Sequence, residues 1–100
     1  MIKEYTHNCI GTCSRLVTIT YDDETHLINE VKFLGGCPGN TKGVSKLCVG
    51  RKLEDVYEIL NGTMCGNRGT SCPNELSKGI NEILKNSWVL KDFFLKTLLL

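Results

Sequence analysis

The sequence predicts an α+β domain in which helices pack on one face of an antiparallel sheet of two to three strands. Two observations support this prediction. Apolar and polar residues alternate within the first 36 residues, and apolar residues recur at helical spacing in the remainder. The length of 100 residues fits a single domain. We divide the chain into a domain at residues 1–87 and an apolar helical extension at residues 88–100.

Two consecutive segments have the alternation of strands. In RLVTITYDD, residues 15–23, Val17 and Ile19 share one face and alternate with threonines. In HLINEVKFLGG, residues 26–36, Val31 and Phe33 share one face. The acidic residues between the segments suit a short turn, which predicts an antiparallel hairpin. KEYTH, near the start of the chain, is a candidate third strand.

Three helices are expected after the strands. The first follows GGCPGNTKG, with Asn40 as its N-cap and Gly50 at its end. The second is KLEDVYEIL, residues 52–60, which ends at an Asn-Gly pair. The third follows Pro73, which suits a first helical turn because its missing N–H has no intrahelical partner there.

The end of the last helix is apolar nearly all round, from Trp88 onward. A helix of this kind needs a partner surface, so we expect a homodimer formed through this extension. Lys91, Asp92 and Lys96 interrupt it, so we expect no transmembrane helix.

Charge and cysteine content limit the function classes. Lys and Arg total 12 and Asp and Glu total 11, so there is no basic field for direct nucleic-acid binding. The first residues, MIKEYTHNC, contain no apolar signal run, which predicts a cytoplasmic protein with reduced thiols. We therefore interpret the six cysteines as metal-binding, redox or buried residues rather than as a disulfide framework.

Two glycine-containing loops each place a cysteine near the start of a helix. Cys37 lies in GGCPGN and Cys72 lies in TSCPN. The positive end of a helix dipole favours a thiolate, which is the form that binds zinc or iron. Cys13 precedes the first long strand, and Cys65 shares the loop of Cys72. These four cysteines are the predicted ligands of a zinc ion or an iron–sulfur cluster.

The same loops support an alternative, which is binding of a nucleotide or flavin phosphate by backbone N–H groups. Lys42 adds positive charge to the first loop. The residues assigned to this alternative are Gly36, Gly39, Asn40, Thr41, Gly66, Arg68, Gly69, Thr70 and Ser71.

A third interpretation is a thiol-redox protein in which Cys65 and Cys72 cycle as a disulfide. The glycines also permit tight turns without any ligand. Cys48 lies on the apolar stripe of a helix and is predicted to belong to the core, and Cys9 is assigned no role. No catalytic residue is predicted, because His7 and His26 have no triad partner in the sequence.

Three segments resemble the TSCPD-domain proteins, which are small bacterial and archaeal proteins named for a Thr-Ser-Cys-Pro-Asp motif. The segments are Cys13-Ser14, VKFLGGCPGNTKGVSKL at residues 31–47 and MCGNRGTSCPNEL at residues 64–76. The resemblance covers about residues 3–85, and Asn74 stands where the motif has Asp.

The TSCPD domain also occurs near the C-terminus of adenosylcobalamin-dependent ribonucleotide reductases. The resemblance therefore implies the label ribonucleoside-diphosphate reductase, with nucleotide binding and DNA synthesis. We do not expect reductase activity from this chain alone, and an accessory role to the reductase is the expectation.

A more distant likeness is to the U-type iron–sulfur scaffold proteins, through a strand, GGC and a helix followed by a cysteine that opens the last helix. It implies that Cys37 and Cys72 are ligands, with Cys13 at the first scaffold position. Partners in the iron–sulfur machinery follow from the same likeness.

Overall fold

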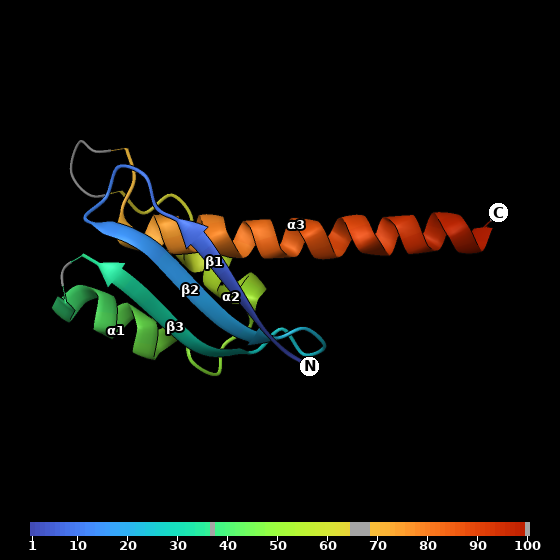
Figure 1. The fold of residues 1–100 in the computed structure, drawn as a ribbon, viewed down its shortest axis with the longest axis horizontal. Helices are drawn as coiled ribbons and strands as arrows, with labels where there is room; N and C mark the ends of the chain where they lie inside the picture. Colours follow the sequence, from blue (N-terminus) through green and yellow to red (C-terminus); the bar gives the residue numbers. More distant parts are fainter. Residues whose placement is uncertain (37, 65–68, 100) are drawn as a thin grey trace.

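A computed structural model describes residues 1–36, 38–64 and 69–99, without the side chains of Pro38 and residues 87–99. Three strands are followed by three helices (Figure 1), which confirms the predicted α+β class. The elements are β1 (Ile2–Asn8), β2 (Ser14–Asp22), β3 (Ile28–Gly35), α1 (Pro38–Cys48), α2 (Leu53–Leu60) and α3 (Cys72–Leu99).

The sheet is antiparallel with the order β1-β2-β3, so the candidate third strand is confirmed as β1. Val17 of β2 pairs with His7 of β1 and with Phe33 of β3. Because strand residues alternate between faces, these three side chains lie on the same face of the sheet. In the turn between β2 and β3, the Asp22 carboxylate accepts hydrogen bonds from the N–H groups of Glu24 and Thr25.

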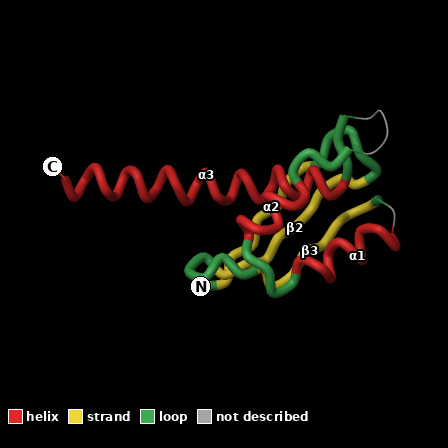
Figure 2. Tube along the Cα trace, turned by 180° about the vertical axis from the view of Figure 1, so that it is seen from behind, coloured by secondary structure: helices red, strands yellow, loops and turns green. Residues whose placement is uncertain are grey.

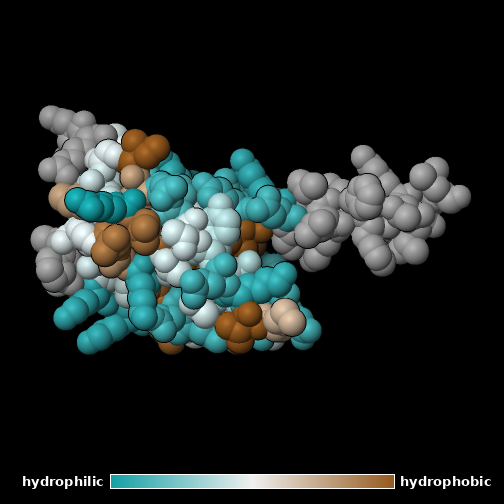
Figure 3. All heavy atoms as spheres, viewed as in Figure 1, coloured by the Kyte–Doolittle hydropathy of each residue, from teal (hydrophilic) through white to brown (hydrophobic). Residues whose placement is uncertain are grey.

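The helices cover one face of the sheet, as the sequence predicts (Figures 1 and 2). The buried core joins the inward residues of the strands to apolar residues of all three helices, and it includes Val17, Ile19, Val31, Cys48, Leu53, Val56, Leu76 and Ile80. Figure 3 shows the molecule from the side of the strands, where hydrophilic residues are common and hydrophobic patches are separate. The burial of Cys48 confirms its prediction as a core residue.

The start of α1 differs from the prediction. The helix begins at Pro38, so Asn40 lies inside its first turn, and its assignment as the N-cap is wrong. Proline is favourable in a first helical turn because its ring fixes φ near the helical value and no N–H is left unpaired. The end of the helix is as expected, because Gly50 follows it with a φ of 83°.

Helix α3 begins at Cys72 and places Pro73 in its first turn, as predicted. Its backbone continues to Leu99 and extends well beyond the sheet (Figure 1). Within the described part of the chain, no helix is long and apolar enough to cross a membrane.

Candidate functional site

The first turn of α3 is capped by the residues that precede it. Ser71 Oγ accepts a hydrogen bond from the N–H of Asn74 at 3.1 Å and donates one to the carbonyl of Thr63. The Ser71 carbonyl accepts the first helical hydrogen bond, from the N–H of Glu75 at 2.8 Å. Ser71 is therefore the N-cap of the helix that begins at Cys72.

Asn74 connects this cap to the preceding loop. Its Oδ1 accepts a hydrogen bond from the N–H of Gly62 at 2.8 Å, and its Nδ2 donates to Thr70 Oγ1 at 3.0 Å. Thr70 Oγ1 in turn donates to Glu75 Oε2 at 2.7 Å. An aspartate at position 74 would accept from Gly62 but would have no N–H to donate to Thr70. The amide of Asn74 thus leaves the single Thr70 proton for Glu75.

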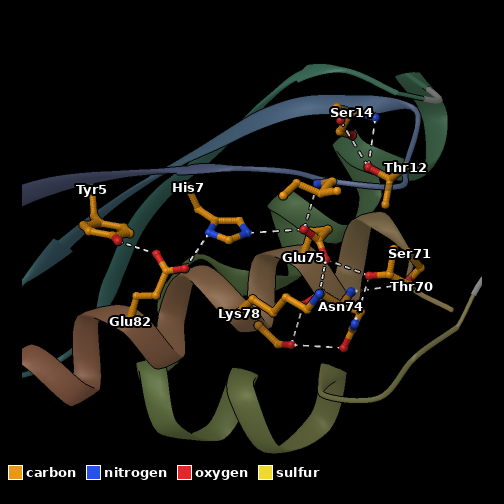
Figure 4. Close-up of polar contacts among 12 residues, drawn as sticks. Tyr5, His7, Thr12, Ser14, Thr70, Ser71, Asn74, Glu75, Lys78 and Glu82 are labelled. Atoms are coloured by element: carbon orange, nitrogen blue, oxygen red, sulfur yellow. Dashed lines mark hydrogen bonds and ion pairs between the residues drawn. The ribbon is translucent and has the colours of Figure 1, made fainter.

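Glu75 is the centre of this network (Figure 4), although its side chain is only 1% exposed. Besides Thr70, its carboxylate accepts a hydrogen bond from the N–H of Ile10 at 3.0 Å and from Lys78 Nζ at 2.9 Å. His7 Nε2 lies 3.3 Å from Glu75 Oε1. Burial raises the pKa of Glu75, but the hydrogen bonds outweigh burial and lower this pKa to about 2.

The network continues on the other side of the His7 imidazole, where Glu82 of α3 lies. His7 Nδ1 lies 2.9 Å from Glu82 Oε1, and the Tyr5 hydroxyl also contacts the Glu82 carboxylate (Figure 4). The contact with Glu82 is the largest cause of the rise in the pKa of Tyr5 to about 12. These polar contacts attach β1 to α3, and the sequence patterns did not predict them.

Cys72, the first residue of α3, lies against the loops that end β3 and begin β2. Its Sγ is 3.0 Å from Ser14 Oγ. Gly36 has a φ of 84°, and a β-carbon there would lie 2.5 Å from Ser14 Oγ and 3.6 Å from Cys72 Sγ. The N–H of Gly36 donates to the carbonyl of Cys13 at 3.1 Å. Glycine is therefore required for the close approach of these three segments.

The structure brings together part of the predicted ligand set. Cys13 and Cys72 belong to the segments that meet at Gly36, with Cys72 partly buried and Cys13 exposed. Cys37 and Cys65 lie outside the described residues. Within residues 1–36, 38–64 and 69–99, no three His, Cys, Asp or Glu side chains form a group that could hold a metal ion. The four-cysteine site thus remains a prediction that depends on Cys37 and Cys65.

Cys9, to which the sequence analysis assigned no role, is close to the same end of α3. Burial, followed by the nearby Glu75 and Cys72, raises the pKa of Cys9 to about 11. Cys9 therefore remains a protonated thiol at neutral pH. The signal that could have revealed His7 and Cys9 is their alternation with Tyr5, which continues one residue beyond β1 on the face that the helices cover.

The residues assigned to phosphate binding fall into two groups. Gly36, Thr41 and Lys42 border a hollow of about 670 Å³ between β3 and α1, where Lys32 and Lys46 add positive charge. Gly39 and Asn40 are exposed in the first turn of α1.

In the second loop, the hydroxyls of Thr70 and Ser71 already take part in the cap of α3. Gly69, with a φ of 76°, allows the chain to turn into this cap. Gly66 and Arg68 lie outside the described residues. Residues of the first loop therefore line the hollow, whereas the described hydroxyls of the second loop form hydrogen bonds within the domain.

Comparison with known proteins identifies one family. The model of that family, described as the TSCPD domain, matches residues 2–84 of the chain. No curated protein and no solved structure shows a significant match.

Proposed function

The chain belongs to the TSCPD-domain family, and we propose that it is a small metal-binding domain that holds zinc or an iron–sulfur cluster through cysteine thiolates. The proposed ligands are Cys13, Cys37, Cys65 and Cys72. Cys37 and Cys72 are the principal ligands in this proposal, and Cys13 and Cys65 complete the set.

The observation that supports this proposal most directly is the packing around Gly36. Its N–H is hydrogen-bonded to the Cys13 carbonyl, and a β-carbon added to it would lie 2.5 Å from Ser14 Oγ and 3.6 Å from Cys72 Sγ. Cys37 is the next residue in the chain. Cys13 and Cys72 thus belong to segments that meet at Gly36, although they are far apart in the sequence.

The chemistry of the described residues fits a thiolate ligand at Cys72. The sulfur lies at the start of a helix of 28 residues, where the helix dipole favours negative charge. The Ser14 hydroxyl, 3.0 Å away, is positioned to donate a hydrogen bond to a thiolate. A zinc ion bound here would link the end of β3, the start of β2 and the start of α3, whereas a cluster would also supply electron transfer.

The Glu75 network supports the site indirectly. The Glu75 carboxylate accepts hydrogen bonds from the N–H of Ile10 and from the Thr70 hydroxyl. In the sequence, Ile10 shortly precedes Cys13 and Thr70 shortly follows Cys65. Both attachments originate from α3, the helix that Cys72 begins. Holding Ile10 and Thr70 in place reduces the entropic cost of closing the metal site.

The test is to purify the protein under anaerobic conditions and to measure its metal content and its absorption spectrum. We expect about one equivalent of zinc, or an absorbing cluster, in the wild type, and a loss of most metal in Cys72→Ala and Cys37→Ala. Cys48→Ala is the matched control because Cys48 lies in the core beside α2, and this variant should keep the metal. Full metal content in Cys72→Ala would overturn the proposal.

A second candidate function is binding of a nucleotide or flavin phosphate. The hollow between β3 and α1 favours it, because Lys32, Lys42 and Lys46 line this space together with the backbone of Gly35 and Gly36. Titration with ADP and with flavin mononucleotide tests this candidate by calorimetry. Binding that is weakened in Lys42→Ala and unchanged in Lys52→Ala would support it.

The remaining proposals concern the setting of the domain. We propose that it works as a homodimer in the cytoplasm, where thiolate ligands stay reduced. Its partner would be a ribonucleotide reductase or a component of the iron–sulfur machinery, in an accessory role. Thiol-redox cycling of Cys65 and Cys72 is a further alternative, and it predicts a reversible disulfide in the metal-free protein.

A further inference from the structure

Helices α1 and α2 leave an apolar groove between them, on the side of the domain away from the Glu75 network. The groove has a volume of about 170 Å³, and its walls include Leu47 of α1 and Ile59 of α2. These two side chains are 67% and 65% exposed, whereas Cys48 at the base of the groove is 3% exposed. Exposed apolar walls around a preformed groove are typical of a surface that binds another apolar segment.

The same chain carries an apolar segment in the last part of α3. Leu84 is the last residue described as buried in α3, and the helix continues to Leu99. Its backbone leads directly away from α1 and α2 (Figures 1 and 2). Residues 88–100 contain nine apolar residues, and a helix of this composition needs a partner surface.

We propose that the α1–α2 groove binds residues 88–100 of a second copy of the chain, and that the exchange is reciprocal in a two-fold symmetric dimer. The lengths agree. Residues 88–99 span roughly 18 Å as a helix, and α1, with 11 residues, spans roughly 16 Å. A reciprocal exchange gives each copy one occupied groove and one covered extension, so the assembly closes at two chains.

The charges on the α2 side of the groove are complementary to the extension. Helix α2 contains Glu54, Asp55 and Glu58 and no basic residue. The extension has Lys91 and Lys96 against a single acidic residue, Asp92. Arg51 lines the groove and α1 contains Lys42 and Lys46, so attraction favours an orientation in which the two lysines of the extension lie on the side of α2.

The extension carries enough apolar area for a stable dimer. The extension contains three aromatic residues, Trp88, Phe93 and Phe94. Each aromatic side chain buries roughly 150–250 Å², so two extensions bury roughly 900–1,500 Å² from these residues alone. Specific interfaces bury about 1,200–2,000 Å² in total, and the leucines of the extension add to the sum.

The test uses the full chain and combines the mass in solution with fluorescence. Trp88 is the only tryptophan, so its emission reports on the extension directly. We expect a dimer with blue-shifted emission for the wild type. Ile59→Asp places a carboxylate in the groove and should weaken dimerisation by roughly 100-fold and shift the emission to the red on dilution.

Two further variants make this test decisive. Leu47→Asp, on the other wall of the groove, should have the same effect, and it decides the case if Ile59→Asp is not folded by circular dichroism. Leu34→Asp is the matched control, because Leu34 is 54% exposed on the helix-free face of the sheet and should leave the dimer intact.

Two results would overturn the proposal. One is a wild type that remains monomeric over the whole dilution series. The other is a dimer with blue-shifted emission in the folded groove variants, which would show that the extensions pair with each other. The inference does not rest on the metal site, and none of these variants touches a proposed ligand.

Discussion

The two glycine-containing loops have similar sequences, but different forces hold them in place. In the first loop, Gly35 and Gly36 both have a φ of 84°, and Gly36 fits because no side chain separates its backbone from Ser14 and Cys72. In the second loop, buried side chains form a network of hydrogen bonds around the start of α3. The first loop therefore depends on close packing at a glycine that has no side chain, and the described part of the second depends on buried hydrogen bonds.

The largest effect is expected where an added atom would enter the first loop. Gly36→Ala places a β-carbon 2.5 Å from Ser14 Oγ and 3.1 Å from Thr41 Cγ2, in a backbone conformation that alanine disfavours. We expect the free energy of unfolding to fall by about 2–5 kcal/mol. Urea denaturation measures this change.

Gly39→Ala is the control for that substitution. Gly39 lies in α1, and a β-carbon added there would meet no heavy atom within 4 Å, so alanine should stabilise the helix by about 0.5–1 kcal/mol. Equal effects of the two substitutions would contradict the close packing of Gly36.

Among the residues that hold the second loop, Glu75 of α3 should have the largest effect on stability, through its charge. Its folded-state pKa of about 2 lies below the ordinary value of 4.5, so the ionised form stabilises the fold. This stabilisation is complete above about pH 5 and is lost as the pH falls through the folded-state pKa. A shift of this size corresponds to about 3 kcal/mol between pH 5 and pH 2.

Denaturation at a series of pH values tests this prediction, with Glu75→Gln as the informative variant. It should be less stable than the wild type at pH 7 and should lose less stability on acidification. Glu58→Gln, at an exposed position of α2, should follow the wild-type curve. Parallel curves for Glu75→Gln and the wild type would remove Glu75 as the source of the pH dependence.

A smaller effect is expected from the cap itself. Ser71→Ala removes the hydrogen bond to the Asn74 N–H and should cost about 1–2 kcal/mol. Ser77→Ala is a suitable comparison, because the Ser77 hydroxyl donates to a helical carbonyl at 2.6 Å, in a position where alanine favours the helix. Thermal unfolding of both variants should show a clearly larger shift for Ser71→Ala.

The smallest effect concerns the departure from the family motif. Asn74→Asp keeps the acceptor for the Gly62 N–H but removes the N–H group that donates to Thr70 Oγ1. The Thr70 hydroxyl can then donate to either of two carboxylates, the one introduced at position 74 or that of Glu75. The repulsion between the introduced carboxylate and Glu75 should raise the pKa of Glu75 and cost about 1 kcal/mol at neutral pH. A titration of Glu75 by NMR in both proteins measures this shift.

The sequence was sufficient to predict the fold because the relevant signals are local. The alternation around Val17 and Ile19 and the helical spacing around Leu76 and Ile80 specify which faces are buried, and the structure confirms both. The start of α1 was misplaced because a proline and an asparagine two positions apart both suit the beginning of a helix.

The site was less predictable because its contacts are not local. His7 and Glu75 are 68 positions apart and Tyr5 and Glu82 are 77 apart, and no local pattern indicates that these side chains meet. Thr70 and Ser71 were assigned to phosphate binding from their glycine-rich surroundings. The structure instead gives their hydroxyls partners in the cap of α3, and the predicted start of that helix near Pro73 was the signal that could have indicated this role.

The central claim, that cysteine sulfurs bind a metal where the two loops meet, is tested most directly by X-ray absorption at the zinc or iron edge. The account predicts a shell of four sulfur atoms at about 2.3 Å for zinc, with one sulfur replaced by a lighter atom in Cys72→Ser. A shell of only nitrogen or oxygen atoms at about 2.0–2.2 Å, or a sulfur shell unchanged in Cys72→Ser, would contradict the account.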